Sequence, residues 1–343
     1  MMIFRADDHR WNRRFLYFLL TSNYIQQQVE SLTSGSAVPQ LPARDLKKFE
    51  LPDIPRNIQD SIEKIIGDLT DKIELNRHTN QTLEHIAQAI FKSWFVDFEP
   101  TRAKIAAKQI GQARQNSERS AALREALLAD GRWPEAVATA IAEGDPERAA
   151  MAAISGNSLD EVNQLSQEQQ EQLKSTAALF PDVLVDSELG EMPEGWKVKT
   201  IEDISTNVAM GPFGSNIKVE TFVDEGIPII NGQQLKGLML EDGENKFITY
   251  EHADKLIRSN VYRDDIVITH RGTLGQVSII PKGSQYDRYI VSQSQCYIRP
   301  NKEVISPLFL IFYFKSYIGQ HELLAHKSQV GVPSIAKPAR RLG

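Results

Sequence analysis

The sequence predicts an α+β protein in which mixed α/β domains are joined by a long coiled-coil spacer helix. Three observations support this: an apolar heptad pattern over residues 57–98, short Val-, Ile- and Tyr-rich runs over residues 186–300, and a repeat that relates residues 15–41 to residues 309–335. The chain of 343 residues also exceeds the size of one ordinary hydrophobic core. We therefore expect two or three folding units.

The repeat aligns without a gap at an offset of 294 residues. Eight of its 27 positions are identical: Phe15, Leu16, Phe18, Ser22, Gln26, Ser34, Val38 and Pro39 recur as Phe309, Leu310, Phe312, Ser316, Gln320, Ser328, Val332 and Pro333. In both copies an apolar helical segment precedes a polar loop that ends in Val-Pro. This self-similarity predicts two related domains, of which only the first continues into a long helix.

The long helix carries its apolar residues at the two seam positions of a heptad repeat. One position holds Ile66, Ile73, Asn80, Ala87 and Trp94, and the other holds Ile62, Leu69, Asn76, Leu83 and Ile90. Asparagine at a buried seam position lowers stability but fixes register, which favours a paired coiled coil. At 1.5 Å per residue the helix would extend about 63 Å, as a spacer would. The alternative is a helix that packs only on its own domains.

The remaining segments predict ordinary elements. Residues 110–180 are rich in Ala, Gln and Glu with Gly or Pro at intervals, which predicts several short helices. Strands are predicted for the Val- and Ile-rich runs, and a helix is predicted for residues 308–325. The predicted strands are Ile227–Ile230, Ile266–Thr269, 277–280 and Tyr289–Val291.

Charge and cysteine content limit the function. The net charge of −6 disfavours a nucleic-acid partner by itself, but residues 255–343 hold 13 basic and 5 acidic side chains. Such a segment fits either DNA binding or a solvated basic face. Cys296 is the lone cysteine, and the sequence shows neither a signal peptide nor an apolar run long enough to span a membrane. We therefore expect a cytoplasmic protein without a membrane segment.

Residues 69–102, with the sequence LTDKIELNRHTNQTLEHIAQAIFKSWFVDFEPTR, contain the aromatic cluster Trp94, Phe95 and Phe98. This run resembles the central conserved region of specificity subunits from type I restriction-modification systems. Residues 186–196 resemble the opening of the second target-recognition domain of such a subunit. The runs 211–218 (GPFGSNIK) and 269–276 (THRGTLGQ) resemble its middle.

The resemblance implies a subunit that reads double-stranded DNA. In that family two target-recognition domains each read half of a split site, and two antiparallel helices hold them apart. The helices also dock the methyltransferase (M) subunits and, through these, the restriction (R) subunits. The aromatic cluster would then serve helix packing or that docking, or else be plain core at a helix end.

On this basis we expect four segments. Residues 1–55 would be the C-terminal part of a first target-recognition domain, 56–108 the central spacer helix, 109–184 an acidic helical connection, and 185–343 a second target-recognition domain. Relative to the family, the chain would lack the first half of the first domain and the distal helix. It would therefore act as a subunit truncated at both ends, or as a half-subunit that pairs through its helix with another half.

Base reading requires polar or basic side chains on exposed loops, with phosphate contacts from basic groups. The candidate DNA-binding residues are Asn216, Lys218, Gln233, Gln234, Arg271, Thr273, Ser292, Gln293, Lys327 and Gln329. The glycines beside Arg271 would let the backbone approach a partner. A tight turn between strands explains the same glycines equally well.

We predict no catalytic residues, metal site or cofactor. The sequence lacks a phosphate-binding loop, a His-Glu-x-x-His pair, a cysteine cluster and an Asn-Pro-Pro-aromatic methyltransferase motif. Glu244 and Lys246 after Asp224 could imitate a nuclease site, which leaves a nuclease as a further alternative. Any restriction chemistry is expected to belong to partner chains.

Overall fold

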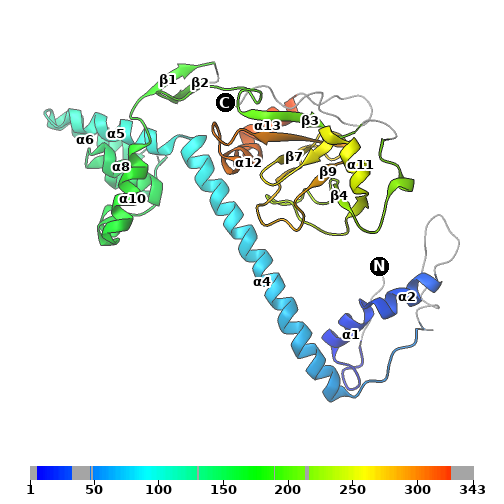
Figure 1. The fold of residues 1–343 in the computed structure, drawn as a ribbon. Coiled ribbons are helices and arrows are strands. Elements are labelled where there is room, and N and C mark those ends of the chain that lie inside the picture. Colours follow the sequence, from blue (N-terminus) through cyan, green and yellow to red (C-terminus); the bar gives the residue numbers. More distant parts are fainter. Residues whose placement is uncertain are drawn as a thin grey trace. The chain divides into compact units, whose positions relative to one another are not determined.

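The computed structural model describes residues 6–32, 47, 49–129, 131–188, 190–212 and 216–325, apart from the side chain of Leu128 (Figure 1). The chain divides into two compact units, Met1–Glu84 and His85–Gly343. The predicted combination of helices, sheets and one long helix is confirmed. Within the described residues, no helix is both long and apolar enough to cross a membrane.

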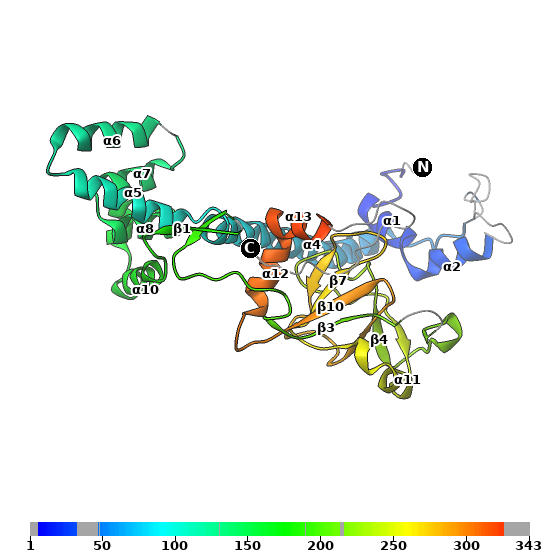
Figure 2. The same ribbon diagram turned by 90° about the horizontal axis from the view of Figure 1, so that it is seen from above.

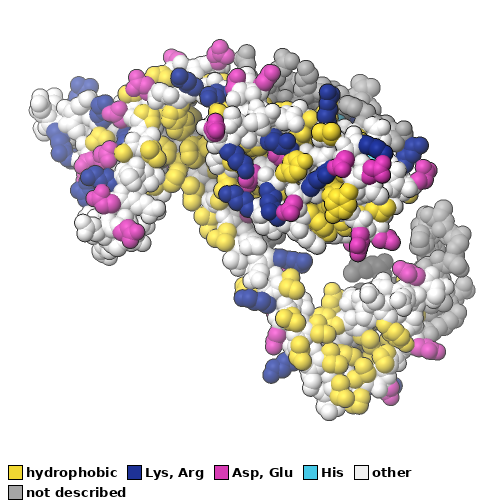
Figure 3. Space-filling model, in the orientation of Figure 1, with side chains coloured by type: hydrophobic (Ala, Val, Ile, Leu, Met, Phe, Trp, Pro, Cys, Tyr) yellow, Lys and Arg dark blue, Asp and Glu magenta, His cyan; other side chains and the backbone are white. Residues whose placement is uncertain are grey.

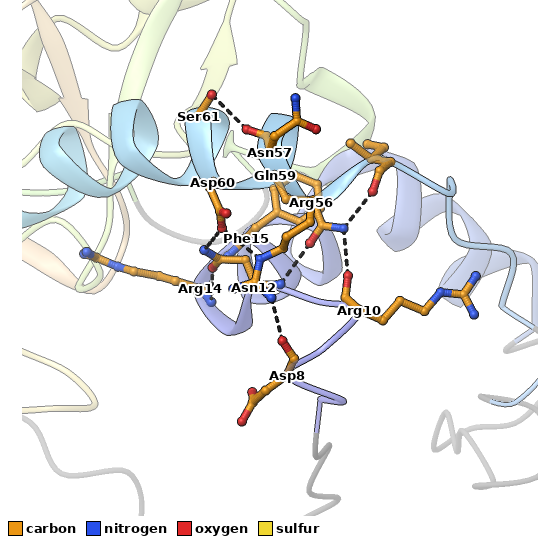
Figure 4. Close-up of polar contacts among 11 residues, drawn as sticks. Asp8, Arg10, Asn12, Arg14, Phe15, Arg56, Asn57, Gln59, Asp60 and Ser61 are labelled. Carbon is orange, nitrogen blue, oxygen red and sulfur yellow. Dashed lines mark hydrogen bonds and ion pairs between the residues drawn. The ribbon is translucent and has the colours of Figure 1, made fainter.

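The first unit joins two short helices, α1 (Arg13–Leu20) and α2 (Asn23–Leu32), to the start of α4 (Arg56–Phe95). Asn12 caps α1, since its Oδ1 atom accepts hydrogen bonds from the amides of Arg14 and Phe15 at 3.0 and 2.9 Å. The same residue donates to α4, from its backbone N to Gln59 at 2.9 Å and from Nδ2 to Asp60 at 2.8 Å (Figure 4). One capping residue thereby fixes α1 against α4.

The long helix ends at Phe95, three residues before the predicted end. Asp97 donates its amide to the carbonyl of Lys92, and Phe98 adopts the left-handed conformation with φ 53°. A non-glycine residue in that region redirects the chain sharply. Pro100 then lies in the first turn of α5 (Glu99–Ala113), so the expected spacer segment 56–108 contains two helices separated by a turn.

Short helices follow α5, as the Ala- and Gln-rich composition predicts. They are α6 (Ser117–Ala129), α7 (Glu135–Ala142), α8 (Pro146–Ser155), α9 (Leu159–Gln164) and α10 (Gln167–Ala178). Their core is built largely from alanine, and small side chains let the helices approach closely. A Cβ atom on Gly111 would lie 2.7 Å from the carbonyl oxygen of Gly144, so α5 needs glycine at this crossing.

The β domain follows the hairpin β1 (Leu184–Ser187) and β2 (Gly190–Pro193). In the described part of the chain it has two four-stranded sheets, with the orders β3-β10-β7-β8 and β5-β4-β9-β6 (Figure 2). The strands are β3 (Ser205–Met210), β4 (Ile227–Ile230), β5 (Lys246–Ile248), β6 (Asn260–Val261), β7 (Ile266–Thr269), β8 (Val277–Ile279), β9 (Tyr289–Val291) and β10 (Gln295–Pro300). Helical turns η2 (Val219–Thr221) and η3 (Ile257–Ser259) and helix α11 (Tyr250–Lys255) connect them.

Alternating side chains build four layers. In β7, Ile266 and Ile268 pack toward α12 (Pro307–Lys315) and α13 (Tyr317–Ala325), whereas Val267 packs between the two sheets. In β9, Ile290 faces the side of the second sheet that carries α11. The layers are therefore α12 with α13, the β3-containing sheet, the β4-containing sheet, and α11. Every predicted strand is confirmed, the third ending one residue early.

The two copies of the repeat have similar local structure over the residues that are described in both. The predicted 308–325 helix is interrupted at Ser316, whose Oγ atom donates to the carbonyl of Tyr313 at 2.7 Å. Ser22 donates in the same way to Leu19 at 2.6 Å between α1 and α2. These atom pairs are related by the offset of 294, so α1–α2 and α12–α13 share one helix-break geometry. Repeat residues 34–39 and 328–333 lie outside the described residues.

Aromatic side chains join the end of α4 to the rest of its unit. The Phe95 ring lies 5.1 Å from that of Phe309 in α12, 6.3 Å from Phe180 and 5.9 Å from Trp196. Phe91 also lies 5.1 Å from Phe309. Of the alternatives for this cluster, the structure supports core packing at a helix end.

Phe91→Ala should destabilise the second unit by about 3–5 kcal/mol, because it removes a buried ring and leaves a cavity. Urea denaturation followed by tryptophan fluorescence measures the change. Leu75→Ala is the control, since Leu75 lies on the same helix with 58% of its surface exposed. Equal effects of the two substitutions would contradict the role of Phe91.

Candidate nucleic-acid interface

Four chain segments meet at one edge of the two sheets. The parallel strands β4 and β9 end there together, and Ser292 after β9 donates its amide to Ile230 at 3.0 Å. The amide of Gly211 donates to Gln295 at 2.8 Å, and that of His270 donates to Ser294 at 3.0 Å. The segments after β3, β4, β7 and β9 therefore form one continuous surface, which we call the loop edge.

Backbone approach at the loop edge is unusually close. A Cβ atom on Gly211 would lie 1.9 Å from the carbonyl oxygen of Ser292. No side chain fits in that space, so glycine is required for the segment after β3 to lie against the β9–β10 turn.

A network of hydrogen-bonded polar side chains, most of them buried, lies behind the loop edge. Gln295, with 1% of its surface exposed, donates from Nε2 to Thr269 at 3.3 Å. Thr269 donates to Oε1 of Gln276 at 3.2 Å, and Ser292 donates to Oε1 of Gln295. Buried polar groups need such partners, so these bonds hold the turns in one arrangement.

Several predicted DNA-binding residues lie on the loop edge. Arg271 and Thr273 are exposed in the β7–β8 turn, Gln233 is exposed after β4, and Gln293 is exposed in the β9–β10 turn. Ser292 is half-buried and belongs to the network of hydrogen-bonded polar side chains. The structure thus brings together candidates that are up to 60 positions apart in the sequence, as from Gln233 to Gln293.

Gln234 differs from the other candidates because it is buried. Its Oε1 atom accepts a hydrogen bond from the amide of Asn231 at 2.9 Å, and its Nε2 atom donates to Asn245 at 3.0 Å. This side chain therefore supports the turn after β4 and offers no group to the surface. The prediction that Gln234 contacts DNA is therefore wrong. Within the turn after β4, the side chain of Gln233 is exposed and that of its neighbour Gln234 is buried.

Asn216 and Lys218 are exposed in the segment between β3 and β4. The carbonyl oxygen of Asn216 contacts Nε2 of His252 at 2.8 Å, which ties this segment to α11. The candidates Lys327 and Gln329 lie outside the described residues.

The β domain carries basic side chains among acidic ones on the face shown in Figure 3. Its basic side chains fall into two groups. One group forms ion pairs, as Arg263 does with Asp287 at 2.7 Å and Arg299 with Asp265 at 2.7 Å. The other group forms no ion pair with any described residue and includes Arg271, Lys218 and Lys236. Lys236 was not among the predicted residues, although it lies in the same polar turn as Gln233. These cations remain available to an anionic partner.

The nuclease alternative gains no support from the geometry. Lys246 lies with its amine 5.0 Å from the centre of the Phe222 ring. In the part of the chain that the structure describes, no group of three or more His, Cys, Asp and Glu side chains could hold a metal ion.

The predicted seam of α4 is largely exposed. The exposed fraction is 38% for Ile66, 61% for Leu69, 52% for Ile73 and 42% for Ile90. Asn76, Asn80 and Leu83 are also exposed, whereas Ile62, Ala87, Trp94, Phe95 and Phe98 are half-buried. Within the part of the chain that the structure describes, the seam is therefore covered mainly toward its two ends. Phe91, Phe180 and Trp196 were missed as partners of the covered end, although Trp196 belongs to a run that resembles the family.

His270 lies just below the loop edge with its ring buried. Burial lowers the pKa of this imidazole, and the positive charge of Arg271 lowers it further, although the contact with the Gln293 carbonyl opposes the shift. The ring is therefore held in its neutral form near pH 7.

Comparison with known proteins shows one family. A model of the "Type I restriction modification DNA specificity domain" matches residues 1–85 and 193–339. The HindI type I restriction enzyme specificity subunit of Haemophilus influenzae is 31% identical over 290 residues, which cover 81% of this chain and 56% of that protein. The MjaIX specificity subunit of Methanocaldococcus jannaschii is 34% identical over 86 residues, or 25% of this chain and 20% of that protein. The chain thus spans about half the length of the HindI subunit.

Solved structures give weak superpositions over most of the chain. The HsdS subunit from Thermoanaerobacter tengcongensis gives a TM-score of 0.30 at 14% identity, covering 97% of this chain and 60% of that one. The S subunit of a type I system from M. genitalium gives a TM-score of 0.33 at 14% identity, covering 92% of this chain and 55% of that one.

Acidification should destabilise the β domain through His270. Because the folded-state pKa lies below the unfolded one, the unfolded chain takes up a proton first, and the free energy of unfolding falls as the pH drops below about 6.5. His270→Gln should reduce this slope, which has a maximum of about 1.4 kcal/mol per pH unit for one group. Urea denaturation between about pH 5.5 and 7.5 measures it. Replacement of the exposed His85 is the control, and an unchanged slope in His270→Gln would contradict the prediction.

Proposed function

This chain belongs to the type I restriction modification DNA specificity family, and from that premise we propose that its β domain reads one half of a bipartite DNA site. The observation that supports this most directly is the loop edge, where exposed amide side chains lie near cations that form no ion pair with any described residue, on a layered core. Such a surface combines the two classes of contact that sequence reading needs, to phosphates and to base edges.

Each exposed side chain of the loop edge suits a particular contact. The guanidinium of Arg271 can donate two hydrogen bonds to guanine, and the amides of Gln233 and Gln293 can pair with adenine. Lys218 suits a phosphate, because its amine is a flexible point charge. Asn216 and Thr273 complete the proposed surface, and Ser292 and Gln234 hold it from beneath. Lys327 and Gln329 remain proposals from the sequence alone.

The subunit itself is proposed to be non-catalytic. Methylation and cleavage would come from M and R subunits that dock on the helical parts of the assembly, as the family resemblance implies. The helix α4, about 60 Å long at 1.5 Å per residue, would set the distance between two half-sites.

A second function, as an assembly half-subunit, is favoured by the exposed seam. A stripe of Ile and Leu side chains that is 38–61% exposed from Ile66 to Ile90 is a costly surface for a lone helix. A second helix of similar length would cover it, and Asn76 and Asn80 would set the register. The partner would be another specificity half-subunit or a second copy of this chain.

Arg271→Ala should weaken binding to the preferred duplex by about 1–3 kcal/mol, the usual contribution of a bidentate arginine-guanine contact. The duplex is first selected from a randomised library by the wild-type chain together with its co-expressed M subunits, and affinity is then measured by fluorescence anisotropy at one fixed salt concentration. Arg263→Ala is the matched control, since that exposed arginine is already ion-paired with Asp287. Equal losses for both variants would contradict a reading role for Arg271.

Leu83→Asp should abolish pairing through α4, because a charge at a seam position must be desolvated when the helices meet. Leu75→Asp is an unusually close control, since both leucines are 58% exposed and only Leu83 lies on the seam. Light scattering coupled to size-exclusion chromatography measures the mass over a concentration series, with and without a co-expressed half-subunit. A wild-type chain that stays monomeric under both conditions would rule out the pairing function.

A further inference from the structure

The side chain of Gln320 in α13 connects the β7–β8 turn to the helix break before α13. Its Nε2 atom donates to the carbonyl of Gly275 at 3.1 Å and to that of Phe314 at 2.7 Å. Both hydrogens of one amide are therefore used, one on the turn and one on the helix pair. In the sequence, Gln320 stands out only as one of the identical positions of the repeat.

The β7–β8 turn is held on both sides. On its N-terminal side, the amides of His270 and Arg271 donate to the carbonyl of Ser294 at 3.0 and 3.3 Å. On its C-terminal side, Leu274 packs against the core between the sheet and α12, Gly275 accepts the bond from Gln320, and Gln276 accepts the bond from Thr269. The side chains of Arg271 and Thr273 are exposed, and within the described residues no hydrogen bond or ion pair holds either of them. The main chain is therefore anchored before and after residues 272 and 273, and the bond from Gln320 to Gly275 is one of the anchors that follow them.

The backbone conformation of Gly275 and its lack of a side chain allow this contact. Its φ of +87° is one that L side chains rarely adopt, and a Cβ atom would lie 2.8 Å from Oε1 of Gln320. The turn therefore approaches α13 closely at one point, and Gln320 fills that point.

One of the two hydrogen bonds of Gln320 recurs in the first copy of the repeat. Its counterpart Gln26 donates from Nε2 to the carbonyl of Leu20 at 3.3 Å, which is the equivalent of the bond from Gln320 to Phe314. The helix-break bond is therefore common to both copies.

We propose that Gln320 is a positioning residue for DNA sequence reading, which acts by holding the β7–β8 turn so that Arg271 and Thr273 meet base edges in one orientation. The inference rests on the proposed reading function of the loop edge. Loss of the Gly275 bond loosens the C-terminal side of the turn while leaving every cation and the main-chain bonds to Ser294 in place. Base-specific contacts need fixed geometry, whereas phosphate contacts tolerate movement. The specific affinity therefore falls and the non-specific affinity stays.

The test compares Gln320→Ala and Gln320→Glu with the matched control Gln26→Ala, each in the full chain co-expressed with its M subunits. The probes are the duplex selected by the wild type and a scrambled duplex of equal length, at one salt concentration. Gln320→Ala should lose about tenfold in affinity for the selected duplex, the size expected for one hydrogen bond at a fixed geometry, and less than about twofold for the scrambled one. Gln320→Glu should lose at least as much, because a carboxylate oxygen would face two carbonyl oxygens. Gln26→Ala should leave the ratio of the two affinities unchanged.

The possible results distinguish a failure of the positioning role of Gln320 from a failure of the proposed reading function. If the wild type shows no preference between the duplexes, the proposed reading function fails. If the wild type discriminates and Gln320→Ala discriminates equally well, or if Gln26→Ala lowers the ratio as much, the positioning role is overturned. Should Gln320→Ala not fold, Gln320→Leu keeps the volume and removes both donors. Hydrogen exchange in the free protein gives an independent measure, with faster exchange expected at residues 270–276 in the Gln320 variants only.

Discussion

The aromatic packing around Phe95 is the contact on which the second unit depends. It joins the last turn of α4 to the segment before β1, to the segment before β3 and to α12, through Phe180, Trp196 and Phe309. The left-handed Phe98, whose ring lies 5.7 Å from that of Trp196, turns the chain at the same place. The end of α4, the short helices α5–α10 and the β domain therefore meet at one cluster of aromatic side chains.

The two ends of α4 are held by different chemistry. At its start, Asn12 and Gln59 connect α1 to the helix through directional hydrogen bonds, and Gln59 is 1% exposed. At its end the contacts are between rings. A polar network specifies one geometry through its donors and acceptors, whereas an aromatic cluster contributes more buried apolar area. Between these ends the helix keeps an apolar stripe exposed.

Much of the fold could be predicted from the sequence, because its signals are local. Alternating Val and Ile residues mark strands such as β4 and β7, and heptads mark α4 within a few residues. The break at Phe98 could not be predicted, since a left-handed phenylalanine is imposed by tertiary packing rather than by propensity. The candidate site was predicted in part. Polar residues in turns can be read from the sequence, but the inward turn of Gln234 and the bond from Gln320 to Gly275 depend on pairings between distant segments.

The loop edge is assembled mainly by the main chain. The bonds from Ser292 to Ile230, from Gly211 to Gln295 and from His270 to Ser294 all join backbone atoms, and the four layers beneath are packed by other residues. The side chains at Arg271, Thr273 and Gln293 consequently contribute little to holding the fold. Substitutions there should cost little stability, so under the proposed function these positions could change the target sequence while the architecture is inherited unchanged.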